Sequence, residues 1–325
     1  MCTAISFSAD DHYFGRNLDL EYSYDESVVI TPRRYPFFFS DGEALPTHHA
    51  MIGVAYISEG YPLYYDGVNE KGLSMAALAF PHEAFYHEKQ ADKRNIAPFE
   101  LIPYVLGKCE SIVQAREMLQ NVNLLCRPFS EALPLTPLHF MISDREGSFV
   151  AEPMQKGFVF HENPVGVLTN SPPFDFHMKH LQMYMGLSAE PAENRFTKEI
   201  ALQSFSRGMG AVGLPGDLSS PSRFIRAAFV KLNSVKGASE SENVGQFFHI
   251  LGAVEQQKGC VHLDGAYEYT VYSSCCNTEK GIYYYTTYEH RGIVGVDMHS
   301  HPLDGETLFS YPLLKEGDIW EISSS

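Results

Sequence analysis

Cys2 is the residue whose position suggests chemistry most directly, because it follows the initiator Met1. Cysteine is small enough that we expect Met1 to be removed, which leaves a thiol and a free α-amine on one residue. An α-amine has an ordinary pKa of about 7.7–8.0, so it is partly neutral near neutral pH and can accept the thiol proton. Position alone is weak evidence, since cysteine is often merely buried. Cys2 is therefore a candidate nucleophile that needs supporting neighbours.

Two charged residues follow Cys2 closely, in the segment FGRNLD at positions 14–19. Residues 9–12, with the sequence ADDH, predict a turn, so this segment should form a strand that pairs with a strand over the first eight residues. Arg16 and Asp19 would then be able to face Cys2. A guanidinium near a thiol favours the thiolate, and a carboxylate can hold an ammonium group by hydrogen bonds. The competing interpretation is an Arg–Asp pair on the surface.

The composition limits the class of protein. Hydrophobic residues make up 44% of the chain and charged residues 20%, as in ordinary soluble globular proteins. The net charge of -16 repels phosphate groups and anionic membranes, so we expect neither a nucleic-acid nor a membrane partner. No stretch approaches the roughly 18 consecutive apolar residues of a membrane helix, and the N-terminus lacks the pattern of a secretory signal. We therefore expect a cytoplasmic protein.

Cysteine and histidine do not form a metal-binding pattern in this sequence. The six cysteines are too sparse for a disulfide framework, and none forms a CxxC pair. The histidine pairs His177 with His180 and His299 with His301 have no cysteine near them at zinc-finger spacing. We therefore expect no metal and no other cofactor.

The hydrophobic pattern predicts strands towards both ends of the chain and helices between them. Strands are indicated over 1–8, 27–31, 51–55, 63–65, 73–80, 139–143, 148–151, 157–160, 165–168, 267–272, 282–287 and 293–296. Helical spacing is seen over 97–119, with a break near Gly107, and over 244–254. Ser220-Pro221 marks a further helix start, which places Arg223 in the first turn. This order predicts stacked sheets with helices outside them.

Five motifs occur along the chain in the order MCTAIS, FGRNLDLEYSY, YDGVNEKGLSMAAL, GVLTNSP and GLPGDLSSPSRF. Together they closely resemble the choloylglycine hydrolases, the group of bile salt hydrolases and penicillin V acylases. The resemblance covers essentially the whole chain. It implies a single domain over residues 1–325 with an α+β fold, the four-layer αββα sandwich of the N-terminal-nucleophile hydrolases. It also implies a homotetramer.

The resemblance assigns catalytic roles to five residues. Cys2 would be the nucleophile, supported by Arg16 and Asp19. Asn170, in LTNSP, would supply a side-chain amide to the oxyanion hole, where one donor is typically worth about 3–4 kcal/mol. Arg223, in SPSRF, would be the remaining active-site arginine. Because a helix start disfavours added positive charge, an anion or carboxylate should face Arg223.

Ala79 departs from the family pattern. Bile salt hydrolases typically carry asparagine at this position, and penicillin V acylases carry tyrosine. The family uses the backbone amide of this residue in the oxyanion hole, and alanine keeps that N–H group. The resemblance also places six residues in the acyl-binding pocket, namely Leu18, Leu20, Ile57, Leu133, Leu135 and Ala79.

The motifs lie nearest to the bile salt branch of the family. The expected substrate is therefore a small molecule, a bile acid conjugated to glycine or taurine, and the expected reaction is hydrolysis of its amide bond. Ala79 leaves open penicillin V or another N-acyl amide, including acyl homoserine lactones. A further alternative is a binding protein without turnover, for example if a retained Met1 caps the amine that the mechanism needs.

Overall fold

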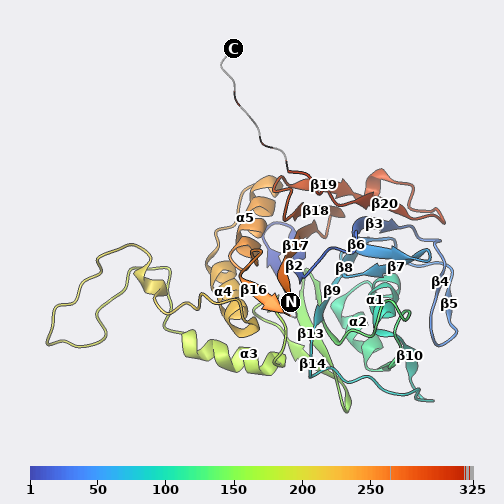
Figure 1. The fold of residues 1–325 in the computed structure, drawn as a ribbon, viewed down its shortest axis with the longest axis horizontal. Helices are drawn as coiled ribbons and strands as arrows, with labels where there is room; N and C mark the ends of the chain where they lie inside the picture. Colours follow the sequence, from blue (N-terminus) through green and yellow to red (C-terminus); the bar gives the residue numbers. More distant parts are fainter. Residues whose placement is uncertain (264, 318, 320–321, 323–325) are drawn as a thin grey trace.

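The computed structural model describes residues 1–325 except 264, 318, 320–321 and 323–325, and its described strands form two large antiparallel sheets packed together (Figure 1). The first sheet has the strand order β15-β1-β2-β17-β18-β19, with β16 paired to β17. Its strands are β15 (Val167–Leu168), β1 (Cys2–Ser8), β2 (His12–Leu20), β17 (Ala266–Asn277), β18 (Ile282–Thr287), β19 (Val294–Asp297) and β16 (Val261–Leu263).

The second sheet has the strand order β14-β13-β12-β9-β8-β6-β3-β20, with β7 paired to β6. Its strands are β14 (Gly157–Glu162), β13 (Gly147–Met154), β12 (Leu138–Asp144), β9 (Ser74–Ala79), β8 (Asp66–Asn69), β6 (Met51–Ser58), β3 (Ser27–Thr31), β20 (Phe309–Pro312) and β7 (Tyr61–Tyr64). Two small pairs lie outside both sheets, β4 (Phe37–Phe38) with β5 (Ala44–Leu45) and β10 (Arg94–Ile96) with β11 (Val122–Leu124).

Helices cover the outer faces of the two sheets. Helices α4 (Ser220–Asn233) and α5 (Glu240–Gly252) contact the first sheet, whereas α1 (Leu101–Lys108) and α2 (Ile112–Leu119) contact the second. Strands β1 and β2 in turn contact β9 across the interface between the sheets. Helix α3 (Phe174–Leu181) packs on α4, and short 3-10 turns are seen at Pro98–Glu100, Gln182–Tyr184, Met209–Ala211 and Met298–Ser300. The expected four-layer αββα arrangement is therefore confirmed.

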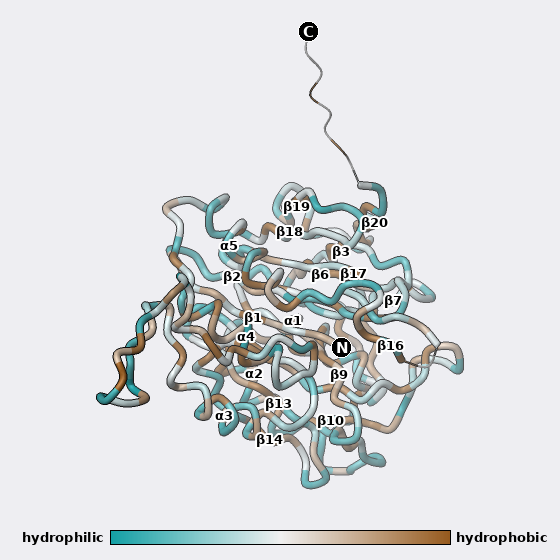
Figure 2. The backbone as a smooth tube through the Cα atoms, turned by 60° about the vertical axis from the view of Figure 1, so that its left-hand side comes forward, coloured by the Kyte–Doolittle hydropathy of each residue, from teal (hydrophilic) through white to brown (hydrophobic). Residues whose placement is uncertain are grey.

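The layering explains why the central strands are buried on both faces. In β1, every residue from Cys2 to Phe7 is buried, because one face meets the second sheet and the other meets α4 and α5. One core cluster fills the space between the sheets and under α4 and α5, and another lies under α1 and α2. The segment between α3 and α4 projects from the body of the molecule (Figure 1), and we call it the projecting segment. Figure 2 shows that hydrophobic and hydrophilic stretches alternate along its exposed backbone.

Gly15, inside the FGRN motif, is required by close packing of two strands. A Cβ atom added at Gly15 would lie 2.0 Å from the carbonyl oxygen of Ser274 in β17. The register of β2 against β17 shifts between Thr270 and Tyr272, near Asp19. Only glycine allows the backbones to approach this closely. The glycine therefore helps to set the position of the neighbouring Arg16.

The sequence pattern predicted most of the long elements but missed α3. The break between α1 and α2 falls at residues 109–111, close to the expected position at Gly107. Helix α3 was not expected, although Asp175 in its first turn is typical of a helix start. Strand β20 near the C-terminus was also missed. No helix of the described residues is long and apolar enough to cross a membrane.

Candidate active site

Pairing of the first two strands brings Cys2, Arg16 and Asp19 into one neighbourhood. Cys2 at the start of β1 lies opposite Leu18 of β2, so the two charged residues flank its partner. The side chains of Arg16 and Asp19 are both fully buried, at 0% exposure. The competing interpretation of a surface Arg–Asp pair is therefore wrong. Charges buried this completely require polar partners close by.

Arg16 is held by backbone carbonyl groups. Its Nη1 donates to the carbonyl oxygens of Tyr65, at 3.0 Å, and of Ala77. Its Nη2 is buried and has no hydrogen-bond partner among the described residues. Burial disfavours the charged guanidinium, but the neighbouring negative groups, Cys2 foremost, raise the pKa of Arg16 above its ordinary value. Arg16 is therefore a fixed positive charge near the thiol, with one donor group still free.

Asp19 lies between a hydroxyl group and a second arginine. Thr270 donates its hydroxyl to Asp19 Oδ1 at 2.6 Å, and Gln256 Nε2 lies 3.4 Å from Oδ2. Nη1 of Arg223 is 4.0 Å from the same Oδ2. Burial raises the pKa of Asp19, although Arg223 opposes the shift. The expectation that a carboxylate faces Arg223 at the start of its helix is confirmed by this contact.

Asn170 links the beginning of β1 to Arg223. Its Oδ1 accepts hydrogen bonds from the Cys2 nitrogen at 2.8 Å and from Arg223 Nη2 at 2.6 Å. Its Nδ2 donates to the carbonyl oxygen of Ala79 at 2.7 Å. The reverse orientation of the amide would set donors against donors, so the network determines this one. The second hydrogen of Nδ2 remains available to a bound molecule.

Arg223 completes the group by fixing the first residues of β1. Its Nη1 donates to the carbonyl oxygen of Cys2 at 2.5 Å and to the hydroxyl of Thr3 at 2.6 Å. Burial lowers the pKa of Arg223, and the charges of Asp19 and Cys2 oppose that shift. All five residues expected in the site, Cys2, Arg16, Asp19, Asn170 and Arg223, are thus brought together. Within the described residues, no cluster of His, Cys, Asp and Glu is arranged to bind a metal.

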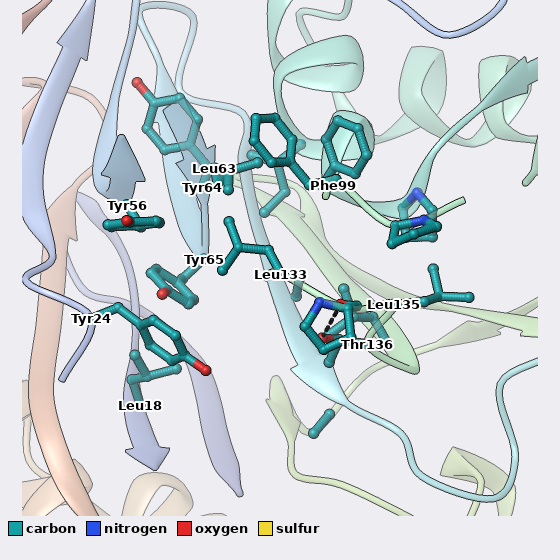
Figure 3. Close-up of a pocket in the computed structure, with 18 of the residues that line it drawn as sticks. Leu18, Tyr24, Tyr56, Leu63, Tyr64, Tyr65, Phe99, Leu133, Leu135 and Thr136 are labelled. Atoms are coloured by element: carbon teal, nitrogen blue, oxygen red, sulfur yellow. Dashed lines mark hydrogen bonds between the residues drawn. The ribbon is translucent and has the colours of Figure 1, made fainter. Parts of the chain in front are cut away.

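Cys2 and Arg16 are among the residues that line an apolar cavity of about 260 Å³. Figure 3 shows a part of its wall. Five of the six residues expected to bind the acyl group line it, namely Leu18, Leu20, Leu133, Leu135 and Ala79. Ile57 lies elsewhere and packs against the core under α1 and α2. The mostly apolar lining is suited to an apolar molecule.

Aromatic side chains form much of the cavity wall, and the sequence pattern did not assign them to it. Figure 3 shows Tyr24, Tyr56 and Tyr65 on one side of the cavity and Phe99 on the other. Phe129 lies beside Phe99, with their ring centroids 5.2 Å apart. These residues come from separate segments of the chain, so no local spacing could have grouped them. The aromatic content of the motif ending in EYSY was the one available indication.

Glu152 helps to hold the segment that contains Asn170 in place. Its Oε1 lies 3.3 Å from His139 Nδ1, and the other ring nitrogen of His139 is 2.9 Å from the carbonyl oxygen of Thr169. Oε1 also accepts the backbone N–H of Phe174 at 2.8 Å, at the start of α3. Glu152 therefore anchors both ends of the segment that carries Asn170.

We expect the ionisation of Glu152 to make the stability of the fold depend on pH. Burial opposes ionisation, but hydrogen bonds from His139 and His161 outweigh it and lower the pKa of Glu152 to about 2. Because the pKa is lower in the folded state, the stabilisation is present above the ordinary pKa near 4.5 and is lost as the pH falls towards 2. Thermal melts should therefore show that Glu152→Gln destabilises the protein at neutral pH and that the difference narrows in acid. Glu162→Gln, at an exposed ion pair with Arg116, is the control; a difference for Glu152→Gln that stays constant with pH would contradict this assignment.

The fold and this site define an amide hydrolase of the N-terminal-nucleophile class. The chain belongs to the choloylglycine hydrolase family of linear amide C–N hydrolases, whose family model matches residues 2–311.

Several relatives match over nearly the whole chain. The bile salt hydrolase/transferase of Lactiplantibacillus plantarum is 51% identical over 324 residues, covering 99% of this chain and 100% of the relative. That of Clostridium perfringens is 38% identical over 317 residues, or 96% of each chain. The crystal structure of the C2A variant of the conjugated bile acid hydrolase from Clostridium perfringens matches with a TM-score of 0.92 and 37% identity, covering 99% of this chain and 100% of that one. A penicillin V acylase from Agrobacterium tumefaciens shares the fold, with a TM-score of 0.76, 18% identity and coverage of 95% and 90%.

Proposed function

We propose that this protein hydrolyses the amide bond of bile acids conjugated to glycine or taurine, with Cys2 as the nucleophile. The observation that carries this proposal is the apolar, aromatic-lined cavity whose lining includes Cys2 and Arg16. A steroid acyl group fits such a lining, and its amide carbonyl would lie at the polar end. The full-length similarity to bile salt hydrolases supports the same substrate class.

The reaction begins once Met1 has been removed. The α-amine of Cys2, held by Asn170 Oδ1, accepts the thiol proton, and the positive charge of Arg16 stabilises the thiolate. The thiolate attacks the amide carbonyl carbon, and the oxygen becomes an oxyanion. The free hydrogen of Asn170 Nδ2 and the backbone N–H of Ala79 are the donors that we assign to it. The ammonium then protonates the leaving nitrogen, and glycine or taurine departs.

The second half of the reaction releases the bile acid. The acyl group is now a thioester on Cys2, and water attacks it while the α-amine again accepts a proton. The C–S bond then breaks, which releases the bile acid and returns the sulfur of Cys2 to its starting state. Arg223 acts by holding the groups around Cys2, since it contacts the Cys2 backbone and Asn170, and Asp19 acts through its ion pair with Arg223. Both bile salt hydrolases compared above carry the name hydrolase/transferase. We infer that an amine can replace water in this step, because it attacks a thioester by the same route.

A substrate panel tests the proposal. We expect the enzyme lacking Met1 to release glycine from glycocholate and taurine from taurocholate with a higher kcat/KM than for penicillin V or an acyl homoserine lactone. The rigid steroid buries more apolar surface in the cavity than either of the others. Amine release can be followed for all four compounds at equal concentration. A higher kcat/KM for penicillin V or for the lactone would reassign the substrate.

The side chain at position 79 should set the size of the acyl group. Ala79 lines the cavity at the end of β9, and a tyrosine there would fill space that the steroid needs. We expect Ala79→Tyr to lower kcat/KM for glycocholate at least about tenfold, mainly through KM, because it removes binding volume and leaves the backbone N–H in place. Ala79→Asn, which is smaller, is the matched control. A fall in kcat with an unchanged KM would mean that Ala79 does not limit the pocket.

We infer that the chain assembles as a homotetramer, as the family resemblance implies. Large apolar side chains in the projecting segment support assembly, since isolated soluble surfaces rarely gather them. Those that are more than 70% exposed are Met183, Met185, Phe196, Phe205 and Val212.

A further inference from the structure

Met1 is bound to the active site through its main chain. Its ammonium group donates to Glu268 Oε1 at 2.6 Å and to the carbonyl oxygen of Asp19 at 2.7 Å. Its carbonyl oxygen accepts the backbone N–H of Asp19 at 2.9 Å. Met1 and Asp19 thus exchange both backbone hydrogen bonds, as a residue pair in an antiparallel ladder does. The structure recognises the main chain of a single residue beside Cys2.

Glu268 is an unusual group to find at this place. Its side chain is only 6% exposed, and among the described residues its hydrogen-bond partner is the ammonium of Met1. Burial raises the pKa of Glu268, whereas the ammonium group opposes that shift. Removal of Met1 takes away this ammonium, and it also takes away the partners of the Asp19 N–H and carbonyl groups. Buried polar groups without partners are costly, so they should bind a replacement.

We propose that the site left by Met1 binds a free L-α-amino acid; the proposal rests on the proposed function, since it requires that Met1 has been removed. The ammonium of the amino acid takes the two acceptors of the Met1 ammonium, Glu268 Oε1 and the Asp19 carbonyl oxygen. Its carboxylate takes the place of the Met1 carbonyl, accepts the Asp19 N–H and lies against the α-ammonium of Cys2. An ion pair thereby replaces the peptide bond between residues 1 and 2.

The site is distinct from the acyl cavity but shares Cys2 with it. Neither Met1 nor Glu268 is among the described residues that line the cavity. The side chain of Met1 is 30% exposed, so the site opens to solvent. Arg223 Nη2 lies 3.5 Å from the Met1 sulfur, which places the side-chain position beside the guanidinium. The site should therefore bind an amino acid with an unbranched side chain, such as methionine, more tightly than glycine, because glycine has no side chain to make this contact.

Occupancy of the site should inhibit hydrolysis. A carboxylate next to the α-amine of Cys2 stabilises its ammonium form and so raises the pKa of that amine. Less of the neutral base is then available near neutral pH to accept the thiol proton. The amino acid therefore acts on the base of the reaction without occupying the acyl cavity.

Thermal shift and calorimetric titration of the enzyme lacking Met1 test the proposal. For a ligand this small we expect millimolar binding, so that about 10 mM L-methionine raises the melting temperature by about 1–2 °C. N-acetyl-L-methionine should not bind, because it lacks the ammonium group, and D-methionine should bind at least about tenfold more weakly because it cannot match all contacts at once. The same chain isolated with Met1 retained, from cells in which methionine aminopeptidase is inhibited, should bind none of them.

Two variants sharpen the result. Glu268→Gln should weaken L-methionine binding at least about tenfold, because it removes the charge that holds the ammonium. Glu289→Gln, at an exposed pair with Lys258, should leave it unchanged. Equal binding of N-acetyl-L-methionine, or binding to the chain that retains Met1, would overturn the proposal even if Glu268→Gln failed to fold. Hydrolysis of glycocholate without added amino acid tests the proposed function separately, so either proposal can fail while the other stands.

Discussion

Replacement of Cys2 by alanine is expected to abolish hydrolysis of glycocholate, with a loss in kcat of at least about 10⁴-fold. Alanine keeps the α-amine and, as a small residue, should still allow removal of Met1, so only the thiol is lost. The buried network around Asn170 and Arg223 contacts the backbone of residue 2 and not its sulfur. The variant should therefore fold and melt near the temperature of the unchanged enzyme. Release of glycine, together with the mass of the N-terminus, measures both points.

Cys126→Ala is the matched control for this experiment. Cys126 is an exposed free cysteine, and unlike Cys2 it does not line the cavity. Its replacement should leave kcat and KM unchanged. Activity that survives in Cys2→Ala but falls in Cys126→Ala would show that Cys2 is not the nucleophile.

Asn170→Ala is expected to lower kcat by about 10²–10³-fold, because an oxyanion donor typically contributes that much to the rate. The amide also accepts hydrogen bonds from the Cys2 nitrogen and from Arg223, so its loss leaves the base less firmly held. KM should change much less than kcat, since Asn170 does not line the acyl cavity. Steady-state kinetics with glycocholate separate the two parameters.

A second buried asparagine distinguishes a catalytic effect from a loss of stability. Asn163 is also buried, and its side chain bonds the backbone of Gly166 and Val167 at the start of β15. Asn163→Ala should lower the melting temperature but leave kcat of the folded enzyme near its original value. If Asn170→Ala reduced kcat no more than Asn163→Ala does, the oxyanion role of Asn170 would be disproved.

The buried charges explain why these residues act as a group. Arg16, Asp19 and Arg223 are fully buried, and each is held by hydrogen bonds to backbone or side-chain partners from other segments of the chain. Removing one charge leaves the others uncompensated in a medium of low polarity, which costs several kcal/mol. Charge-removing variants at these positions should therefore report on folding as well as on catalysis. For this reason, substitution of the Cys2 thiol or of the neutral Asn170 amide tests catalysis more directly.

Local sequence was sufficient to predict the strand pair that begins at Cys2 and the helix that carries Arg223. Both depend on neighbours a few residues apart, namely the turn at 9–12 and the Ser220-Pro221 helix start. The family motifs extended this to Asn170 and to the layered fold. They did so because the residues around one reacting carbonyl carbon must have particular side chains, so each motif allows few other residues.

The remaining features were decided by contacts between distant segments. Thr270 and Glu268 reach the site because β17 pairs with β2, more than 200 residues away in the chain. The aromatic wall of the cavity depends on how side chains from separate segments meet, and Ile57 packs instead against the core under α1 and α2. A period-two or period-3.6 pattern records which side of an element is buried, not what it is buried against. The nucleophile can therefore be predicted from the sequence, whereas the groups that hold the amine of Cys2 and the substrate are defined only by the tertiary structure.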